Sequence, residues 1–141
     1  MKRISRSAIL EHSAARMYAL VEDIESYPAF LPWCVGAQVH ERTAEITRAT
    51  LSVGVRGMRL SFTTLNRNRP GEGIDLELVE GPFRAFSAAW TFQPLAEGAC
   101  RIEYSMSYEL GKTGKLLEPL FDRIADTMVN AFSQRADALY K

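Results

Sequence analysis

The sequence contains few of the residues that build metal sites, disulfide frameworks or membrane spans. Its 141 residues include two histidines and two cysteines, and neither histidine has a partner at the spacing of metal ligands. No apolar run approaches the ~18 residues that a helix needs to cross a bilayer. Lysine plus arginine equals aspartate plus glutamate at 17 each, so no net charge draws the chain to DNA or anionic lipid. These shortages argue against a zinc module, a disulfide-stapled domain, an integral membrane protein and a DNA-binding protein.

Catalytic residues are missing from the sequence as well. His12 is expected at a strand-to-helix junction and His40 in a polar strand, and we interpret both as ordinary surface residues. There is no glycine-rich phosphate loop after a strand and no G-x-S-x-G motif. The acidic residues of the predicted strands alternate outward and are expected to face water, namely Asp75, Glu77 and Glu103. We therefore predict no catalytic residue, no metal ion and no required cofactor.

The N-terminal segment and the cysteines indicate a cellular compartment. Residues 1–17 carry basic side chains without the apolar stretch of a signal peptide, so we expect a cytoplasmic protein with reduced thiols. Cys34 follows Trp33 in a proline-rich stretch and is interpreted as a small buried thiol. A disulfide between Cys34 and Cys100 is the minor alternative.

Hydrophobic periodicity predicts three helices. Ser13 is expected to cap a helix over residues 14–23, and Ser26 to cap a very short second helix with Pro28 in its first turn. From about Lys115 onward an apolar stripe recurs every three or four residues, which predicts a terminal helix of roughly 25 residues. Pro119 falls in or near the first turn of that helix, where a missing N–H does little harm.

Alternation with a period of two predicts strands before and between these helices. An opening strand ends near Leu10, residues 38–48 supply a strand and a turn, and further alternating runs lie between residues 50 and 108. Turn signals separate the runs at residues 54–57, 70–73, 81–82 and 97–98. Strands with one wet face joined by short turns make an antiparallel meander, whose apolar face the long helix can cover. We predict one α+β domain, residues 1–141, with a curved antiparallel sheet around the terminal helix.

Four motifs, in this order, resemble one known family. They are SYPAFLPWCVG at residues 26–36, SFTTLNR at 61–67, EGPFR at 80–84 and FDRIADTMVNAFSQRA at 121–136. The set is similar to the coenzyme Q-binding and RatA-like family, a branch of the START-like superfamily that also includes polyketide cyclases. The resemblance covers nearly the whole chain and implies the helix-grip fold.

The resemblance implies two functions and leaves both open. Mitochondrial members are linked to binding coenzyme Q and supporting respiration, and bacterial members are described in the same way or as a RatA toxin of the large ribosomal subunit. We favour non-enzymatic binding of a hydrophobic ligand, ubiquinone or another isoprenoid lipid, as a carrier for respiration. The alternative is a RatA-like toxin that binds the large ribosomal subunit and blocks subunit association. A cyclase-like enzyme is a weaker alternative.

The ligand is expected between the sheet and the terminal helix, because a curved sheet gripping one straight helix rarely closes at both ends. The alternative is that the apolar side chains fill each other's space, since protein interiors are densely packed. A quinone head group would need one or two donors, for which Tyr104, Tyr108 or Arg84 could serve. The predicted ligand-binding residues are Tyr27, Phe30, Leu31, Trp33, Leu60, Phe62, Leu76, Phe83, Trp90, Tyr104, Phe121, Ile124 and Met128.

The segment YPAFLPW at residues 27–33 packs four bulky apolar side chains, an alanine and two prolines into seven residues. The prolines stiffen the backbone, so the aromatic side chains are available to border the mouth of the pocket. Phe83, in a second stiff corner, is expected to join them there. The alternative is that these side chains form a satellite core beneath the short helices.

A group of arginines offers a second interaction surface. Arg56, Arg59, Arg67 and Arg69 are expected near one hairpin, where a solvated face is the default interpretation. The first alternative is a patch that contacts phosphates of ribosomal RNA, which would make binding strongly salt-dependent. The second is transient docking to anionic lipid, which would place the protein peripherally at the inner membrane during quinone exchange.

Overall fold

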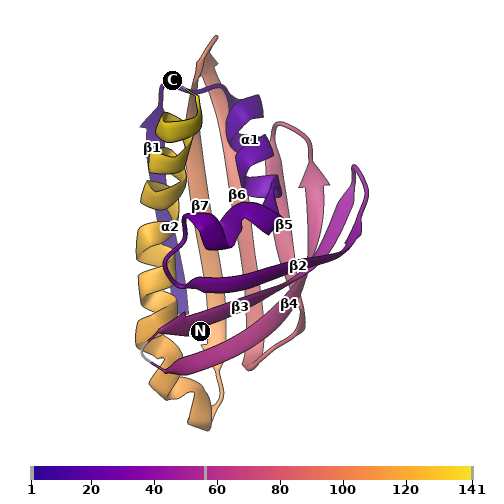
Figure 1. Cartoon of the computed structure of the whole chain (residues 1–141), viewed down its shortest axis with the longest axis vertical. Helices are drawn as coiled ribbons and strands as arrows, with labels where there is room; N and C mark the ends of the chain where they lie inside the picture. The colour runs from indigo at the N-terminus through magenta and orange to yellow at the C-terminus, as the bar shows by residue number, and fades with distance from the viewer. Residues whose placement is uncertain (1, 56, 141) are drawn as a thin grey trace.

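The computed structural model describes residues 2–55 and 57–140, without the side chains of residues 55, 58 and 113–115. A strand and two short helices are followed by six strands, a 3₁₀ helix and a long terminal helix (Figure 1). In chain order these are β1 (Lys2–Leu10), α1 (Ala14–Glu22), η1 (Ile24–Ala29), β2 (Cys34–Arg42), β3 (Ile46–Val55), β4 (Met58–Arg69), β5 (Gly73–Glu80), β6 (Phe83–Ala96), β7 (Ala99–Leu110), η2 (Lys112–Leu117) and α2 (Glu118–Leu139). This order confirms the predicted α+β helix-grip fold.

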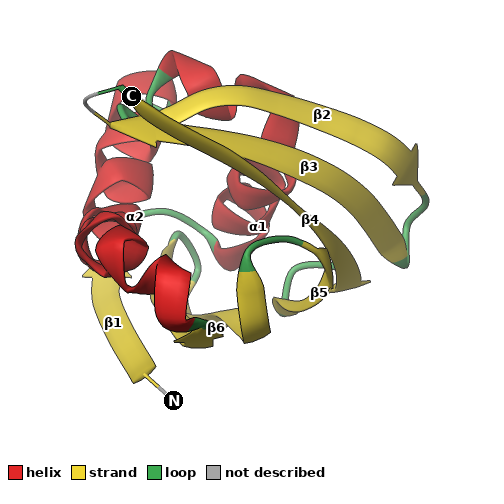
Figure 2. Cartoon of the chain, turned by 90° about the horizontal axis from the view of Figure 1, so that it is seen from below, coloured by secondary structure: helices red, strands yellow, loops and turns green. Residues whose placement is uncertain are grey.

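The seven strands form one antiparallel sheet in the order β1-β7-β6-β5-β4-β3-β2. Strands β2 to β7 therefore make the predicted meander, and β1 pairs with β7 to extend it. Register shifts interrupt the β2–β3, β4–β5 and β6–β7 pairings, and such bulges bend a sheet. Figure 2 shows the result, with β2, β3 and β4 arching over the interior and α2 lying along the opening.

The ends of the two short helices follow local signals, with one correction. Ser13 caps α1 as predicted, because its hydroxyl accepts a hydrogen bond of 3.1 Å from the backbone N–H of Arg16. The predicted Ser26 cap is wrong, since η1 begins at Ile24 and the Ser26 hydroxyl instead donates to Asp23 at 2.6 Å. Asp23 closes α1 and the chain turns directly into η1, so Pro28 lies near the end of this 3₁₀ helix.

The terminal helix begins three residues later than predicted. Residues 112–117 form η2, and α2 starts at Glu118 with Pro119 in its first turn. Its apolar stripe is buried against the concave face of the sheet, as Figure 1 shows for the helix as a whole. The stripe consists of Leu120, Phe121, Ile124, Ala125, Met128, Val129, Phe132 and Ala136.

Polar contacts fasten the edge strand β1 and the junction after it to α2. The Lys2 ammonium group lies 2.7 Å from the carboxylate of Asp122, and the Arg6 guanidinium lies 2.6 Å from the carboxylate of Asp126 on the same helix face. The interpretation of His12 as a surface residue is wrong, because α2 covers the junction between β1 and α1. His12 is 6% exposed, and its Nε2 lies 2.7 Å from Asp137 Oδ1. His40 is exposed, as predicted.

Both cysteines are buried. Cys34 and Cys100 are free thiols, so the disulfide alternative is not realised. Burial raises the pKa of each thiol above its ordinary value, which keeps both in the neutral form. In the part of the chain that the structure describes, no helix combines the length and the apolarity that a membrane span requires.

Candidate functional site

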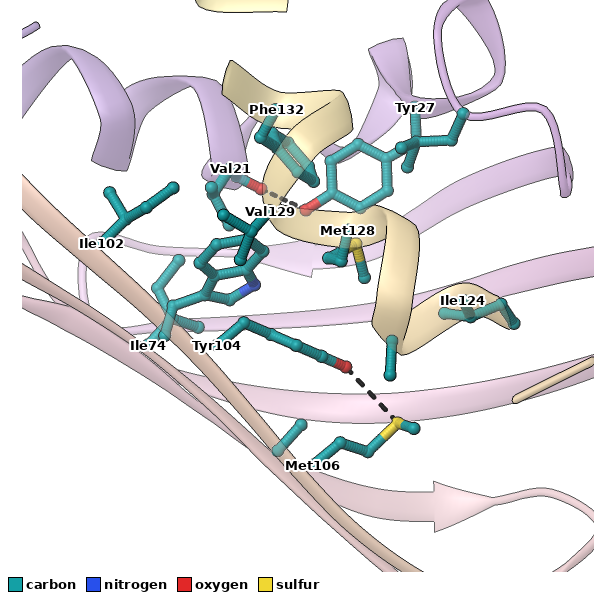
Figure 3. Close-up of a cluster of buried hydrophobic side chains, with 14 of the residues drawn as sticks. Val21, Tyr27, Ile74, Ile102, Tyr104, Met106, Ile124, Met128, Val129 and Phe132 are labelled. Atoms are coloured by element: carbon teal, nitrogen blue, oxygen red, sulfur yellow. Dashed lines mark hydrogen bonds between the residues drawn. The ribbon is translucent and has the colours of Figure 1, made fainter. Parts of the chain in front are cut away.

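An apolar cavity lies between α2 and the concave face of the sheet. Figure 3 shows buried side chains from both of its sides, among them Tyr104 of the sheet and Met128 of α2. Strand alternation turns one side chain in two toward the cavity, and the buried stripe of α2 closes the opposite wall. Its volume is about 40 Å³. The lining consists of Tyr27, Trp33, Leu51, Phe62, Leu76, Phe86, Trp90, Tyr104, Met106, Phe121, Ile124 and Met128.

The cavity is much smaller than the pocket that we predicted. A water molecule needs roughly 10–15 Å³ of such space, so the cavity has room for about three water molecules, whereas ligand pockets usually measure about 300–1,000 Å³. The expectation of a ligand-sized gap is therefore wrong for this conformation. The reason is the size of the aromatic rings, since Trp90 alone packs against Tyr104 at 4.9 Å and against Phe132 at 5.2 Å between ring centroids.

The structure brings most of the predicted ligand-binding residues together around this cavity. Those that line it are Tyr27, Trp33, Phe62, Leu76, Trp90, Tyr104, Phe121, Ile124 and Met128. Those that do not are Phe30, Leu31, Leu60 and Phe83. Leu51, Phe86 and Met106 also line the cavity. The alternation of their strands points all three inward, but they were not among the predicted ligand-binding residues.

The YPAFLPW segment divides between the two roles proposed for it. Tyr27 and Trp33 line the cavity, and Trp33 Nε1 donates to Thr127 on α2 at 3.2 Å. Leu31 is buried outside the cavity, and the Phe30 ring packs on Phe132 at 5.0 Å, as a satellite core would. This segment therefore closes the interior against the middle of α2.

Phe83 lies apart from that segment. Its ring packs against Phe62, Phe86 and Phe121, with centroids 5.8, 5.0 and 4.8 Å away, and against Tyr108 at 6.2 Å. This aromatic cluster covers the interior near the first turn of α2. The expectation that Phe83 and the YPAFLPW segment border one common mouth is therefore wrong, because they pack on different turns of α2.

Tyr104 is the best placed of the three predicted donors. Its hydroxyl is buried in the cavity wall and donates to Met106 Sδ at 3.5 Å, a weak acceptor (Figure 3). Burial raises its pKa, so the group remains a donor at neutral pH. Tyr108 instead donates to Asp122 at 3.1 Å outside the cavity, and Arg84 is exposed on β6. The Tyr104 hydroxyl can therefore donate a stronger hydrogen bond to a ligand oxygen than it now donates to the Met106 sulfur.

A polar compartment of about 20 Å³ adjoins the cavity and was not foreseen. Thr47 of β3 and Asn66 and Asn68 of β4 are its polar lining from the sheet, and all three side chains are buried. The alternation along β4 could have revealed this compartment. Every second residue of β4 points inward, and this series runs from Phe62 through Thr64 to Asn66 and Asn68. Polar residues on the core face of a strand indicate a buried hydrogen-bonding site.

The predicted arginine patch is not a single surface. Arg59 lies at the start of β4 and Arg69 at its end, and ten residues at about 3.3 Å each separate them by about 30 Å. Arg67 and Arg69 each pair with an acidic side chain of β5, at 3.0 and 2.5 Å. Arg56 lies outside the described residues. The expectation of one patch near one hairpin is therefore wrong, since β4 carries Arg59 at one end and Arg67 and Arg69 at the other.

Comparison with known proteins agrees with this geometry. The family described as polyketide cyclase / dehydrase and lipid transport matches residues 10–133. The Zhui aromatase/cyclase from Streptomyces sp. R1128 superimposes with a TM-score of 0.88 at 16% identity, over 99% of this chain and 96% of that one, which shows the shared fold.

Two curated relatives are similar to the chain over nearly its whole length. The ribosome association toxin RatA of Escherichia coli K12 is 41% identical over 99% of this chain and 90% of its own length. The mitochondrial coenzyme Q-binding protein COQ10 homolog B of Xenopus laevis is 29% identical over 99% of this chain and 60% of its own length. The chain therefore belongs to the polyketide cyclase / dehydrase and lipid transport family of START-like proteins, in the branch with RatA-like and coenzyme Q-binding relatives.

Proposed function

We propose that this protein binds a hydrophobic ligand of the quinone or isoprenoid class between α2 and the sheet, without performing chemistry on it. The observation that carries the proposal is the Tyr104 hydroxyl, buried in an apolar cavity and donating only to a thioether sulfur. A carbonyl oxygen on an otherwise apolar ligand is the stronger acceptor that this donor lacks. Burial of the ligand's apolar area would supply affinity, at about 25 cal/mol per Å² before ordering costs.

The small volume of the cavity requires the walls to move when the ligand binds. Met106 and Met128 are flexible thioether side chains that adopt new rotamers at low cost. On the opposite side, β2 packs on η1, so these two elements can move together, and widening would separate the Phe30 ring from that of Phe132 on α2. The proposal is therefore one of induced widening, with the structure representing the closed state.

A titration with decylubiquinone tests the proposal. Both tryptophans of the chain line the cavity, so a bound quinone should quench most of the intrinsic fluorescence. Tyr104→Phe removes the donor and should weaken binding about fivefold, the worth of one neutral hydrogen bond. Tyr108→Phe is the matched control, because its hydroxyl bonds Asp122 outside the cavity. An absence of saturable quenching, with no quinone or lipid in an organic extract of the purified protein, would contradict the proposal.

Ribosome association is the second candidate, and the 41% identity to RatA of E. coli favours it. Contact with ribosomal RNA would be mainly electrostatic and would weaken steeply with salt. The test is sedimentation with purified large ribosomal subunits at low and high salt. Arg59→Glu should reduce association more than Arg67→Glu, which changes the charge equally, because the guanidinium of Arg67 is already paired with Glu77. Equal sedimentation with and without subunits would exclude this function.

A further inference from the structure

The polar compartment beside the apolar cavity has the size of a single hydroxyl group. Its volume is about 20 Å³, and it shares Tyr27, Leu76 and Trp90 with the apolar cavity. About 10–15 Å³ holds one water molecule, so one hydroxyl group fits there and a ring does not. The three shared side chains are the boundary across which a ligand in the cavity would extend one small polar substituent into the compartment.

A chain of hydrogen bonds fixes which atom of Asn68 remains free. The Glu22 carboxylate only accepts, so the Thr47 hydroxyl, 3.2 Å away, must give its proton to Glu22. Thr47 Oγ1 is then an acceptor, and Asn68 presents its amide nitrogen to it at 3.0 Å. The carbonyl oxygen of Asn68 consequently faces away from Thr47.

That oxygen is a buried acceptor without a donor. Asn68 is 9% exposed, and no group among residues 2–55 and 57–140 donates to its Oδ1. The neighbouring Asn66 Oδ1, in contrast, accepts from the Thr64 hydroxyl at 2.7 Å. A buried unpaired acceptor is unfavourable, and a ligand that brings a donor removes this cost. A ligand carbonyl would instead place a second acceptor oxygen against Asn68 Oδ1.

We infer that the polar compartment binds a hydroxyl group of the ligand, so that the reduced hydroquinone form of a quinone is bound in preference to the oxidised form. This inference rests on the proposed function. The hydroxyl next to Asn68 donates its proton. Asn68 and Tyr104 stand in one cross-strand row through Ile74 and Trp90, so a hydroquinone lying along this row directs its second oxygen toward the Tyr104 hydroxyl. The oxidised quinone satisfies Tyr104 but leaves Asn68 unpaired.

The test is partition of a redox pair between the protein and phosphatidylcholine vesicles. Vesicles carrying decylubiquinone or decylubiquinol are equilibrated anaerobically with the protein, and the protein fraction is analysed by chromatography. Decylubiquinol should bind about fivefold more tightly, the worth of one hydrogen bond. Binding of both forms with equal affinity would overturn the inference and leave the proposed function intact. Binding of neither form would overturn the proposed function.

Variants then locate the preference at Asn68. Asn68→Leu should bring the two affinities to within about twofold by weakening the quinol alone, whereas Asn130→Leu, on the exposed face of α2, should retain the wild-type ratio. Thr47→Val provides a second variant if Asn68→Leu does not fold, because without Thr47 the amide is free to turn its donor toward the ligand. A preference that survives whichever variant folds would contradict the assignment to Asn68.

Discussion

The apolar cavity and the polar compartment meet at Trp90 and form an apolar half and a polar half of the interior. The same sheet lines both halves, but with different kinds of side chain. The apolar half is surrounded by aromatic and aliphatic side chains, with Tyr104 as its inward hydroxyl on β7. The polar half is organised by the bonds that join Glu22, Thr47 and Asn68. Inward positions on β4 alone pass from Phe62 in the first half to Asn68 in the second.

The difference separates two kinds of specificity. Dispersion contacts have no direction, so the apolar half can repack around ligands of several shapes at modest cost. Hydrogen bonds have direction, so the polar half would accept one chemical group in one orientation. A hydrophobic carrier built in this way would accept variable tails and select the polar substituent of the ligand.

Phe132→Ala is the substitution that should affect the apolar half most. Phe132 is fully buried on α2, and its ring contacts those of Tyr27, Phe30 and Trp90 with centroids 5.0–5.4 Å apart. The cavity left behind should lower the free energy of unfolding by about 3–5 kcal/mol.

Urea unfolding followed by circular dichroism measures this loss. Leu139→Ala on the same helix is the control, because Leu139 is 50% exposed and should cost less than about 1 kcal/mol. Similar losses in both variants would mean that α2 is not held by its buried stripe.

Thr47→Val tests the polar half with a change of almost no volume. The substitution leaves the Asn68 amide and the Glu22 carboxylate without their shared partner, which should cost about 1–3 kcal/mol. Thr50→Val on the same strand is the control, since Thr50 lies on the opposite face, partly exposed, and bonds Thr63 and His40. Thermal unfolding of the two variants should differ clearly, and equal melting temperatures would show that the buried network contributes little.

Sequence periodicity predicted the apolar half better than the polar half. Alternation along the strands and the helical stripe from Leu117 onward identified residues such as Trp90, Tyr104 and Phe121 as inward-facing, because burial follows directly from period and apolarity. Asn66 and Asn68 escaped the same reasoning, since polar residues at the end of a strand are usually solvated. Their compartment is completed by Val21 and Glu22 at the end of α1, which come from a distant part of the chain, and no local pattern contains such a contact.

The size of the cavity could not be predicted either. Whether facing apolar residues leave a gap depends on rotamers and on distances of a few ångströms between elements, and the sequence specifies neither. The arginine prediction was wrong for a simpler reason. The turn signals at residues 54–57 and 70–73 already bracket a twelve-residue strand, and the length of that strand, β4, separates Arg59 from Arg69. His12 is buried by Asp137 and its neighbours at the other end of the chain.

Stability at alkaline pH tests a smaller effect, which is the difference in pKa between tyrosines of the folded protein and the same tyrosines in the unfolded chain. Burial raises the pKa values of Tyr27 and Tyr104, and burial with the bond to Asp122 raises that of Tyr108 to about 12. Unfolded tyrosine ionises near pH 10. The folded protein holds these protons longer, so stability is complete below about pH 10 and falls as the pH rises toward 12.

For Tyr108 the loss should reach about 1 kcal/mol by pH 11, because the unfolded side chain is then mostly ionised and the folded one is not. Denaturant unfolding between pH 8 and 11.5 measures the slope with which the free energy of unfolding falls as the pH rises. Tyr108→Phe should make this slope shallower. The pH dependence that remains comes from Tyr27 and Tyr104. An unchanged slope in this variant would mean that Tyr108 ionises equally easily in both states. The contact between β7 and the first turn of α2 would then be open to water, and the interior would be closed only around Trp90 and the YPAFLPW segment.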